Sequence, residues 1–199
     1  MTAPTATPTA LPAATGTWAI DPAHATVEFA VKHLMVSTVK GRFRGVTGAV
    51  QVHESDFTLS SVTAAADVAS IDTGVEQRDE HLRSDDFFNA EKFPQITFRS
   101  TKIEPNGDDW RLTGDLTIRD VTRPVVFDVE HEGRIIDPWG NDRAGFTATA
   151  KINRKDFGVN WNGVIEAGGV VVSDAVKITL NVEFVKQAID PHLFDSLTH

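Results

Sequence analysis

The residues best suited to acid–base chemistry are Asp79 and His81, which lie two positions apart in a polar segment. A carboxylate and an imidazole can act as general base and acid when both are held within hydrogen-bonding reach of the reacting group. Residues two positions apart on a helix point to different sides, so local geometry does not orient this pair. We therefore favour a structural role, in which Arg78, Asp79, His81 and Arg83 tie the segment to the fold. Contact with a ligand head group is the second interpretation, and catalysis is the third.

Arg154 and His33 are two further candidates for contact with a ligand. Arg154 stands near the end of an expected strand, and Asp156 and Gly158 follow it. Such an arginine usually braces a turn, although its guanidinium group can also bind an anionic or carbonyl group. His33 continues the apolar phase of the strand before it, so it should point inward, either as a core residue or as a partner for a ligand oxygen.

Other kinds of site find little support in the sequence. The chain has no cysteine, which excludes disulfides, thiolate nucleophiles and iron–sulfur clusters. Its seven histidines include no pair spaced to hold a metal ion from a single element. Nucleotide-binding and hydrolase motifs are absent as well. We therefore expect no catalytic residue, no metal and no cofactor.

Composition and charge narrow the class of protein. The chain has 199 residues, of which 41% are hydrophobic and 24% are charged, as is typical of one soluble globular domain. The formal net charge of −9 comes from 19 Lys and Arg against 28 Asp and Glu. An acidic surface repels phosphate backbones, so we expect no nucleic-acid partner.

The elements that position these side chains are predicted from a period of two in hydrophobicity, which is typical of strands with one apolar face. The pattern is clearest over residues 176–184 and recurs along the chain, giving about eight strands separated by short turns, which favours antiparallel pairing. Such strands can close into a barrel or stack as two sheets. The phase slips between residues 39 and 52, where Gly41, Gly45 and Gly48 indicate a bend, and this favours a barrel.

Residues 72–88 break the strand pattern and predict one short helix. Asp72 or Thr73 is expected to cap its start, and Asp79 and Arg83 form a pair at i,i+4. A single helix in a chain of strands has to lie against the sheet, and we expect it to cover one end of the barrel.

Several short sequence motifs are each weak evidence of a protein family, but their order along the chain makes the match specific. They are Trp18-Ala-Ile-Asp-Pro-Ala-His24 with Phe29 and His33, Gly41-Arg-Phe43, Ser70-Ile-Asp-Thr73, Arg78-Asp-Glu-His-Leu-Arg-Ser-Asp-Asp-Phe-Phe88, Lys92-Phe-Pro-Gln-Ile-Thr-Phe98, Gly114-Asp-Leu-Thr-Ile118, Val121-Thr-Arg-Pro-Val125, Ile152-Asn-Arg-Lys-Asp-Phe-Gly158 and Val172-Ser-Asp174. Together they resemble the YceI-like family of lipocalin-shaped, polyisoprenoid-binding proteins over about residues 18–184. Asp120 is a small departure, because the family often has glycine there.

The resemblance implies an all-β fold: an extended eight-stranded antiparallel lipocalin-like barrel, with one short helix capping an end and a long apolar tunnel inside. It also implies non-enzymatic binding, storage or transport of a polyisoprenoid, an isoprenoid quinone or a similar lipid, often by a homodimer. The expected walls of the tunnel are Phe29, Val31, Phe98, Leu116, Ile118, Phe127, Phe146, Ile178 and Leu180. The expected polar end is formed by His33, Arg78, His81 and Arg154.

The expected organisation is one barrel domain over residues 17–187 between a disordered, uncharged Ala/Thr/Pro tail at 1–16 and a C-terminal tail at 188–199. The first tail has neither the basic region nor the apolar run of a secretory signal, so we expect a cytoplasmic protein without a transmembrane segment, making at most transient membrane contact. Two alternatives to a lipid carrier stay open: a solid barrel acting as a stress or interaction module, and an enzyme acting on a lipid head group.

Overall fold

The computed structural model describes residues 16–53, 55–165 and 169–188. The expected tails at 1–16 and 188–199 therefore lie outside the described residues, apart from Gly16 and Ala188. Gly16 is the first residue of a strand.

Strands make up most of the described chain. They are β1 (Gly16–His33), β2 (Ser37–Phe43), β3 (Val46–Val52), β4 (Ser61–Asp67), β5 (Ile71–Asp72), β6 (Gln95–Asn106), β7 (Asp109–Ile118), β8 (Val121–Ile136), β9 (Asp142–Asn153), β10 (Val164–Ile165), β11 (Gly169–Val170) and β12 (Val172–Lys186). The helices within the described residues are α1 (Glu76–Arg83) and three 3₁₀ turns, η1 (Phe57–Leu59), η2 (Val68–Ser70) and η3 (Arg154–Phe157). The prediction of an all-β fold with one short helix is confirmed.

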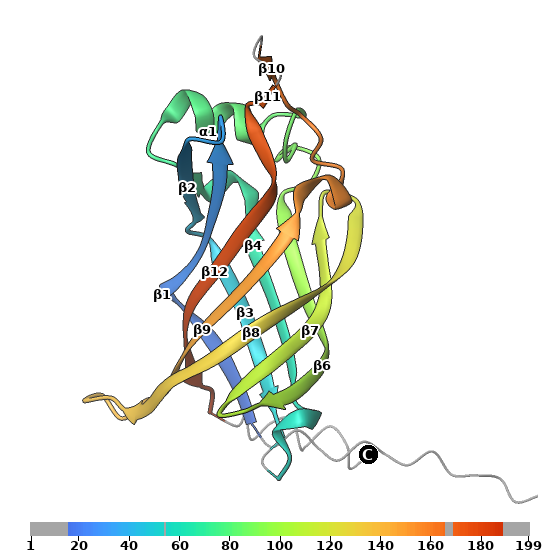
Figure 1. Cartoon of the computed structure of the whole chain (residues 1–199). Coiled ribbons are helices and arrows are strands. Elements are labelled where there is room, and N and C mark those ends of the chain that lie inside the picture. The colour runs from blue at the N-terminus through green and yellow to red at the C-terminus, as the bar shows by residue number, and fades with distance from the viewer. Residues whose placement is uncertain (1–15, 54, 166–168, 189–199) are drawn as a thin grey trace, which may run out of the picture.

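Eight of these strands form a closed antiparallel barrel, in the order β1, β3, β4, β6, β7, β8, β9 and β12 (Figure 1). The ring closes between the first and the last strand, where Phe29 pairs with Ile178 and Ile20 with Phe184. Closure leaves no bare edge around the ring, which is how small barrels avoid edge-to-edge aggregation. The preference for a barrel over two stacked sheets is confirmed.

The long strand β1 is covered on one side by two shorter strands in succession. Its first residues pair with β3 and its last residues pair with β2. Between β2 and β3, the backbone N–H groups of Arg44 and Gly45 donate instead to Ser70 Oγ, at 3.1 and 3.0 Å. The bend predicted from the phase slip between residues 39 and 52 lies at this point.

Three register irregularities move the inward-facing phase of a strand from one parity to the other. They lie between Ile20 and Ala25 in β1, between Ser100 and Lys102 in β6, and between His131 and Gly133 in β8. A bulge adds a residue to one strand, so the side chains after it change face. Alternation in the sequence therefore predicts which face of the sheet a side chain takes only within a stretch that contains no bulge.

The two ends of the barrel differ. Figure 1 shows α1 and the β10–β11 hairpin at one end, which we call the helix end, and the projecting β8–β9 hairpin at the other, which we call the hairpin end. Among the described residues, no helix combines the length and the apolar character that a membrane crossing needs.

The start of α1 differs from the prediction. Val75 occupies the N-cap position and makes no side-chain capping bond. The Asp72 carboxylate accepts from the N–H of Gly74 at 2.9 Å, and the Thr73 hydroxyl donates to Asp79 at 2.5 Å. The prediction of Asp72 or Thr73 as the cap is wrong because the Asp72 side chain accepts from Gly74 in the turn before the helix, and the Thr73 hydroxyl donates to Asp79 inside the helix.

Candidate ligand-binding cavity

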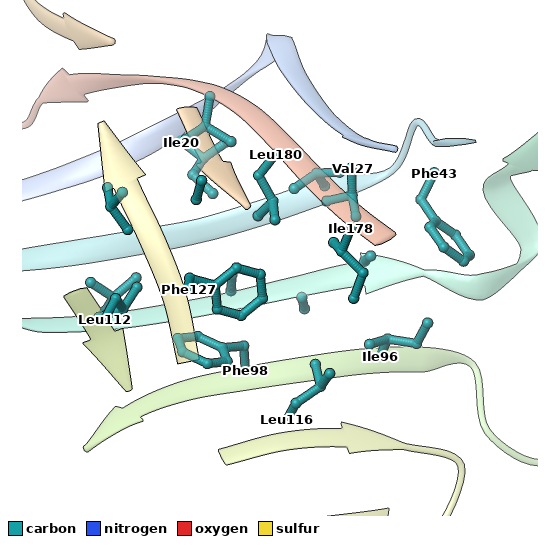
Figure 2. A pocket seen from close by; sticks show the side chains of 18 of the residues that line it. Ile20, Val27, Phe43, Ile96, Phe98, Leu112, Leu116, Phe127, Ile178 and Leu180 are labelled. Carbon is teal, nitrogen blue, oxygen red and sulfur yellow. The ribbon is translucent and has the colours of Figure 1, made fainter. Parts of the chain in front are cut away.

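The barrel encloses an apolar cavity of about 480 Å³. All eight barrel strands contribute side chains to it, and Figure 2 shows Val27, Phe98, Leu116, Phe127 and Ile178 converging on the same interior space. Small-molecule pockets typically enclose about 300–1,000 Å³. The interior is therefore hollow enough to hold a ligand.

The structure brings all nine of the sequence-predicted wall residues together around this cavity. The lining includes Phe29, Val31, Phe98, Leu116, Ile118, Phe127, Phe146, Ile178 and Leu180, and also Arg154. Their position fits a ligand wall, and their contact with a ligand stays a prediction.

Other lining residues were not among the expected walls of the tunnel. Val27, Leu112, Val176 and Val182 share the inward phase of strands that were identified correctly, so the same alternation could have found them. Trp18 and Ile20 also line the cavity, but they precede the bulge in β1 and so belong to the other parity. No sequence signal placed them on the same wall as Phe29.

Arg154 lies at the helix end, where it is 5% exposed. Its Nη1 donates to the carbonyl oxygens of Val159 at 2.8 Å and Trp161 at 2.7 Å, and its Nε donates to Ser173 O at 3.0 Å. Nη2 adds a bond of 3.3 Å to Val172 O. Burial lowers the pKa of Arg154 below its usual value. Its donors are directed to the loop that follows η3 and to the start of β12.

Arg78 and Asp79 tie α1 to the turn before it. Arg78 donates from Nε to Thr73 Oγ1 at 2.7 Å and from Nη2 to Thr73 O at 3.0 Å. Asp79 is buried and accepts from the N–H and the hydroxyl of Thr73. Arg78 does not line the cavity, so its contacts fit the structural interpretation of this segment.

His81 and His33 also lie outside the cavity lining. His81 Nε2 lies 2.7 Å from Asp86 Oδ2, and its ring packs edge-on against Phe87 and Trp161. Because Asp79 is bonded to Thr73, the Asp79–His81 pair does not form. The structure thus brings Arg154 alone of the four expected polar-end residues to the cavity.

Ion pairs gather around Arg143 at the base of the β8–β9 hairpin. Its Nη1 lies 2.7 Å from Asp21 Oδ2 and 3.1 Å from Glu183 Oε2, and its Nε lies 2.7 Å from Asp137 Oδ2. Hydrogen bonds from Arg143 and then His24 lower the pKa of Asp21 to about 2. Those from Arg143 also hold the pKa of Asp137 far below its usual range.

The same cluster contains three potential metal ligands, Asp21, His24 and Glu183, whose ligand atoms lie within 4.8 Å of one another. The Arg143 guanidinium group already supplies the positive charge between Asp21 and Glu183. The hydrogen bond to Asp21 raises the pKa of His24. These contacts make the cluster a salt-bridge network that anchors the hairpin.

At the hairpin end the lining contains two exposed polar residues of β8, His131 and Arg134. The His131 ring packs on Phe146 with 5.0 Å between ring centroids. The Arg134 guanidinium lies over the Trp18 ring, 5.1 Å from its centroid. Neither residue was singled out from the sequence.

The chain matches the family described as YceI-like domain over residues 18–184. The chain belongs to the YceI-like family. The Escherichia coli protein YceI is 40% identical over 164 residues, which cover 82% of this chain and 83% of that protein.

Two solved structures share this barrel fold. The crystal structure of BcnA from Burkholderia cenocepacia matches with a TM-score of 0.72 and 25% identity, covering 82% of this chain and 98% of that chain. A polyisoprenoid-binding domain from Saccharophagus degradans matches with a TM-score of 0.61 and 14% identity, covering 85% of this chain and 98% of that chain. The match to the Saccharophagus degradans domain shows a shared fold alone.

Proposed function

We propose that this YceI-like protein binds a long-chain hydrophobic molecule inside its barrel and stores or carries it without changing it chemically. The observation that carries this proposal is the apolar cavity of about 480 Å³. Its lining residues, among those that the structure describes, include no aspartate or glutamate. A cavity of this kind favours apolar contact along the length of a chain.

The ligand class that we propose is a polyisoprenoid, an isoprenoid quinone or a similar lipid. A strand of 12 residues such as β9 extends about 40 Å, comparable with a long lipid tail. Each buried methylene contributes about 0.8 kcal/mol, so affinity should grow with chain length. The Saccharophagus degradans domain, named for polyisoprenoid binding, supports the view that this fold can hold such chains.

Two alternatives are less well supported. A solid interaction module would need a filled interior, whereas this barrel holds an open cavity. An enzyme acting on a lipid head group would need acid and base groups at the reacting atoms, and the titratable residues of the described lining are His131, Arg134 and Arg154. A homodimer, a cytoplasmic location and transient membrane contact stay part of the proposal.

Native mass spectrometry of the purified chain, followed by solvent extraction, tests the proposal. We expect a bound lipid that is removed by extraction and replaced when polyprenol or quinone is added. A barrel that is isolated empty and takes up neither probe would contradict it.

A further inference from the structure

The cavity reaches solvent at the hairpin end. Of the residues that line it, those classed as exposed are Thr97, His131 and Arg134. Thr97 lies between the inward-facing Ile96 and Phe98, so its side chain is on the outer face of β6. His131 and Arg134 are therefore the residues that mark the mouth.

One wall of the barrel ends at this point because β7 stops while its neighbour β8 continues. The pairing of β7 with β8 ends at Trp110 and Val129, while residues 130–136 of β8 continue and pair with β9 alone. The Trp110 ring packs against Phe57 of η1, with 4.7 Å between centroids. Aromatic side chains thus frame one side of the mouth, and the end of β8 frames the other.

A bulge directs Arg134 toward the cavity. Phe127, Val129 and His131 line the cavity at every second position, which would make Gly133 the next inward residue. The register shift between His131 and Gly133 moves Arg134 into that phase, over the Trp18 ring. Bulges that re-aim a side chain are common beside functional sites.

The charge of Arg134 is already balanced. Its Nε donates to Asp142 Oδ1 at 2.7 Å and its Nη2 donates to Asp142 Oδ2. The hydrogen bond from Arg134 lowers the pKa of Asp142, so this carboxylate is ionised at neutral pH. Anions usually bind arginine through the paired face that Asp142 occupies here.

Hydrogen-bonding capacity is nevertheless left over at the mouth. Arg134 Nη1 and both ring nitrogens of His131 have no hydrogen-bond partner among the described residues. An incoming phosphate or carboxylate would have to displace Asp142 or lie beside its negative charge. An uncharged acceptor can use the free donors without either cost.

We propose that the mouth at the hairpin end holds the polar head group of the ligand, and that His131 and Arg134 select an uncharged hydrogen-bonding head group, such as an alcohol, amide or quinone carbonyl. This inference rests on the proposed function, because it assumes that an apolar chain fills the barrel. It assigns the head group to the end opposite α1. At the helix end Arg154 is committed to backbone carbonyls.

Probes with one chain and different head groups test this inference: geranylgeraniol, geranylgeranyl diphosphate and the corresponding hydrocarbon, measured by native mass spectrometry and fluorescence titration on the full chain. We expect the wild type to bind the alcohol about fivefold more tightly than the hydrocarbon, the value of one net hydrogen bond. The diphosphate should bind more weakly than the alcohol.

Two variants, with a matched pair of control variants, test whether Arg134 and Asp142 determine the head-group preference. Arg134→Met should reduce the preference for the alcohol over the hydrocarbon, while Asp142→Asn should improve diphosphate binding about tenfold by freeing the guanidinium. Arg111 and Asp128 form a similar pair on β7 and β8, at 3.8 Å and exposed. Arg111→Met and Asp128→Asn should change neither preference.

The outcomes separate the two proposals. If no probe binds to any form of the protein, the proposed function fails and the inference fails with it. If the chains bind but the wild type prefers the diphosphate, or if Arg134→Met keeps the alcohol preference, the inference alone is overturned. A loss of that preference in Arg154→Met but not in Arg134→Met would place the head group at the helix end.

Discussion

Nη1 of Arg154 donates a hydrogen bond of 2.7 Å to the backbone carbonyl oxygen of Trp161. The same nitrogen bonds to Val159 O, and the guanidinium group also reaches Ser173 and Val172. One buried side chain thus joins the loop after β9 to the start of β12. A residue that the sequence offered as a ligand contact closes the helix end of the barrel.

Replacing Arg154 should therefore affect stability. Arg154→Met leaves buried carbonyl oxygens without donors, and we expect the free energy of unfolding to fall by about 3 kcal/mol, at 1–3 kcal/mol for each unsatisfied group. Arg154→Lys retains one donor position and should lose about half as much. Urea denaturation measures both, with the exposed Arg99→Met as control. Equal stability of Arg154→Met and wild type would refute a bracing role.

Filling the cavity should strongly reduce ligand uptake at little cost in stability. Ala148 lies on β9, lines the cavity and pairs in register with Leu180. Ala148→Phe places a ring in the open space, so we expect uptake of polyprenol in native mass spectrometry to fall at least tenfold, roughly the loss of two buried methylenes. Val126→Phe adds the same ring to the outer face, where Val126 is 47% exposed, and should leave uptake unchanged.

Stability measured on the same two variants distinguishes a hollow barrel from a solid one. Overpacking a filled core costs typically about 1–3 kcal/mol. We expect Ala148→Phe to cost less than that, because the ring enters existing space. A large loss of stability with no change in uptake would contradict a ligand-holding cavity.

The Arg143 cluster should make the fold sensitive to acid. The pKa of Asp21 falls from 3.8 to about 2 in the folded protein, chiefly because of Arg143. A carboxyl group with a lowered folded-state pKa stabilises the fold above its unfolded pKa, and this contribution is lost as pH falls through the folded value. Stability should therefore decline from about pH 4 to about pH 2.

Comparison with Arg143→Met isolates this contribution, because that variant lacks the group that lowers the pKa of Asp21 and Asp137. Its urea midpoint should fall less steeply over the same interval. Asp72, whose pKa is lowered to about 2 mainly by Arg44, titrates in both proteins and cancels in the comparison. If the urea midpoints of wild type and Arg143→Met fall in parallel as the pH is lowered, the Arg143 cluster is not the source of the acid sensitivity.

Gly114 should tolerate no side chain, because a Cβ atom there would lie 2.3 Å from Phe98 Cζ and 2.5 Å from the backbone oxygen of Arg99. The Phe98 ring lies across this position on the inner wall. Gly114→Ala should lower the free energy of unfolding by about 1–3 kcal/mol and push Phe98 into the cavity. Thermal or urea denaturation measures the change.

Gly145 is the control for this prediction. A Cβ atom at Gly145 would meet only Glu132 Cβ, at 3.5 Å. Gly145→Ala should therefore change stability by no more than about 0.5 kcal/mol, as surface substitutions usually do. Similar losses at both positions would show that strand glycines matter here for a reason other than contact with Phe98.

Much of the barrel could be predicted from the sequence because it depends on local periodicity. Val176, Ile178 and Leu180 alternate with polar residues, and each lines the cavity as the pattern indicates. The helix over one end was also predicted, although its cap was not, because Asp72 and Thr73 bond to groups that only folding brings beside them, such as Arg44 and Asp79. His33, which the phase of β1 was expected to direct inward, lies outside the cavity lining, and the register is irregular between Val31 and His33.

The sequence by itself determined an acidic, cysteine-free chain of alternating strands with one short helix, since composition and a period of two are properties of neighbouring residues. The tertiary structure decided which distant strands meet, as β1 meets β12, and which face each side chain takes after a bulge. It therefore decided that Arg154 bonds to backbone carbonyls while Arg134 reaches the mouth. Both outcomes depend on register and on contacts between segments far apart in the chain, which local pattern does not encode.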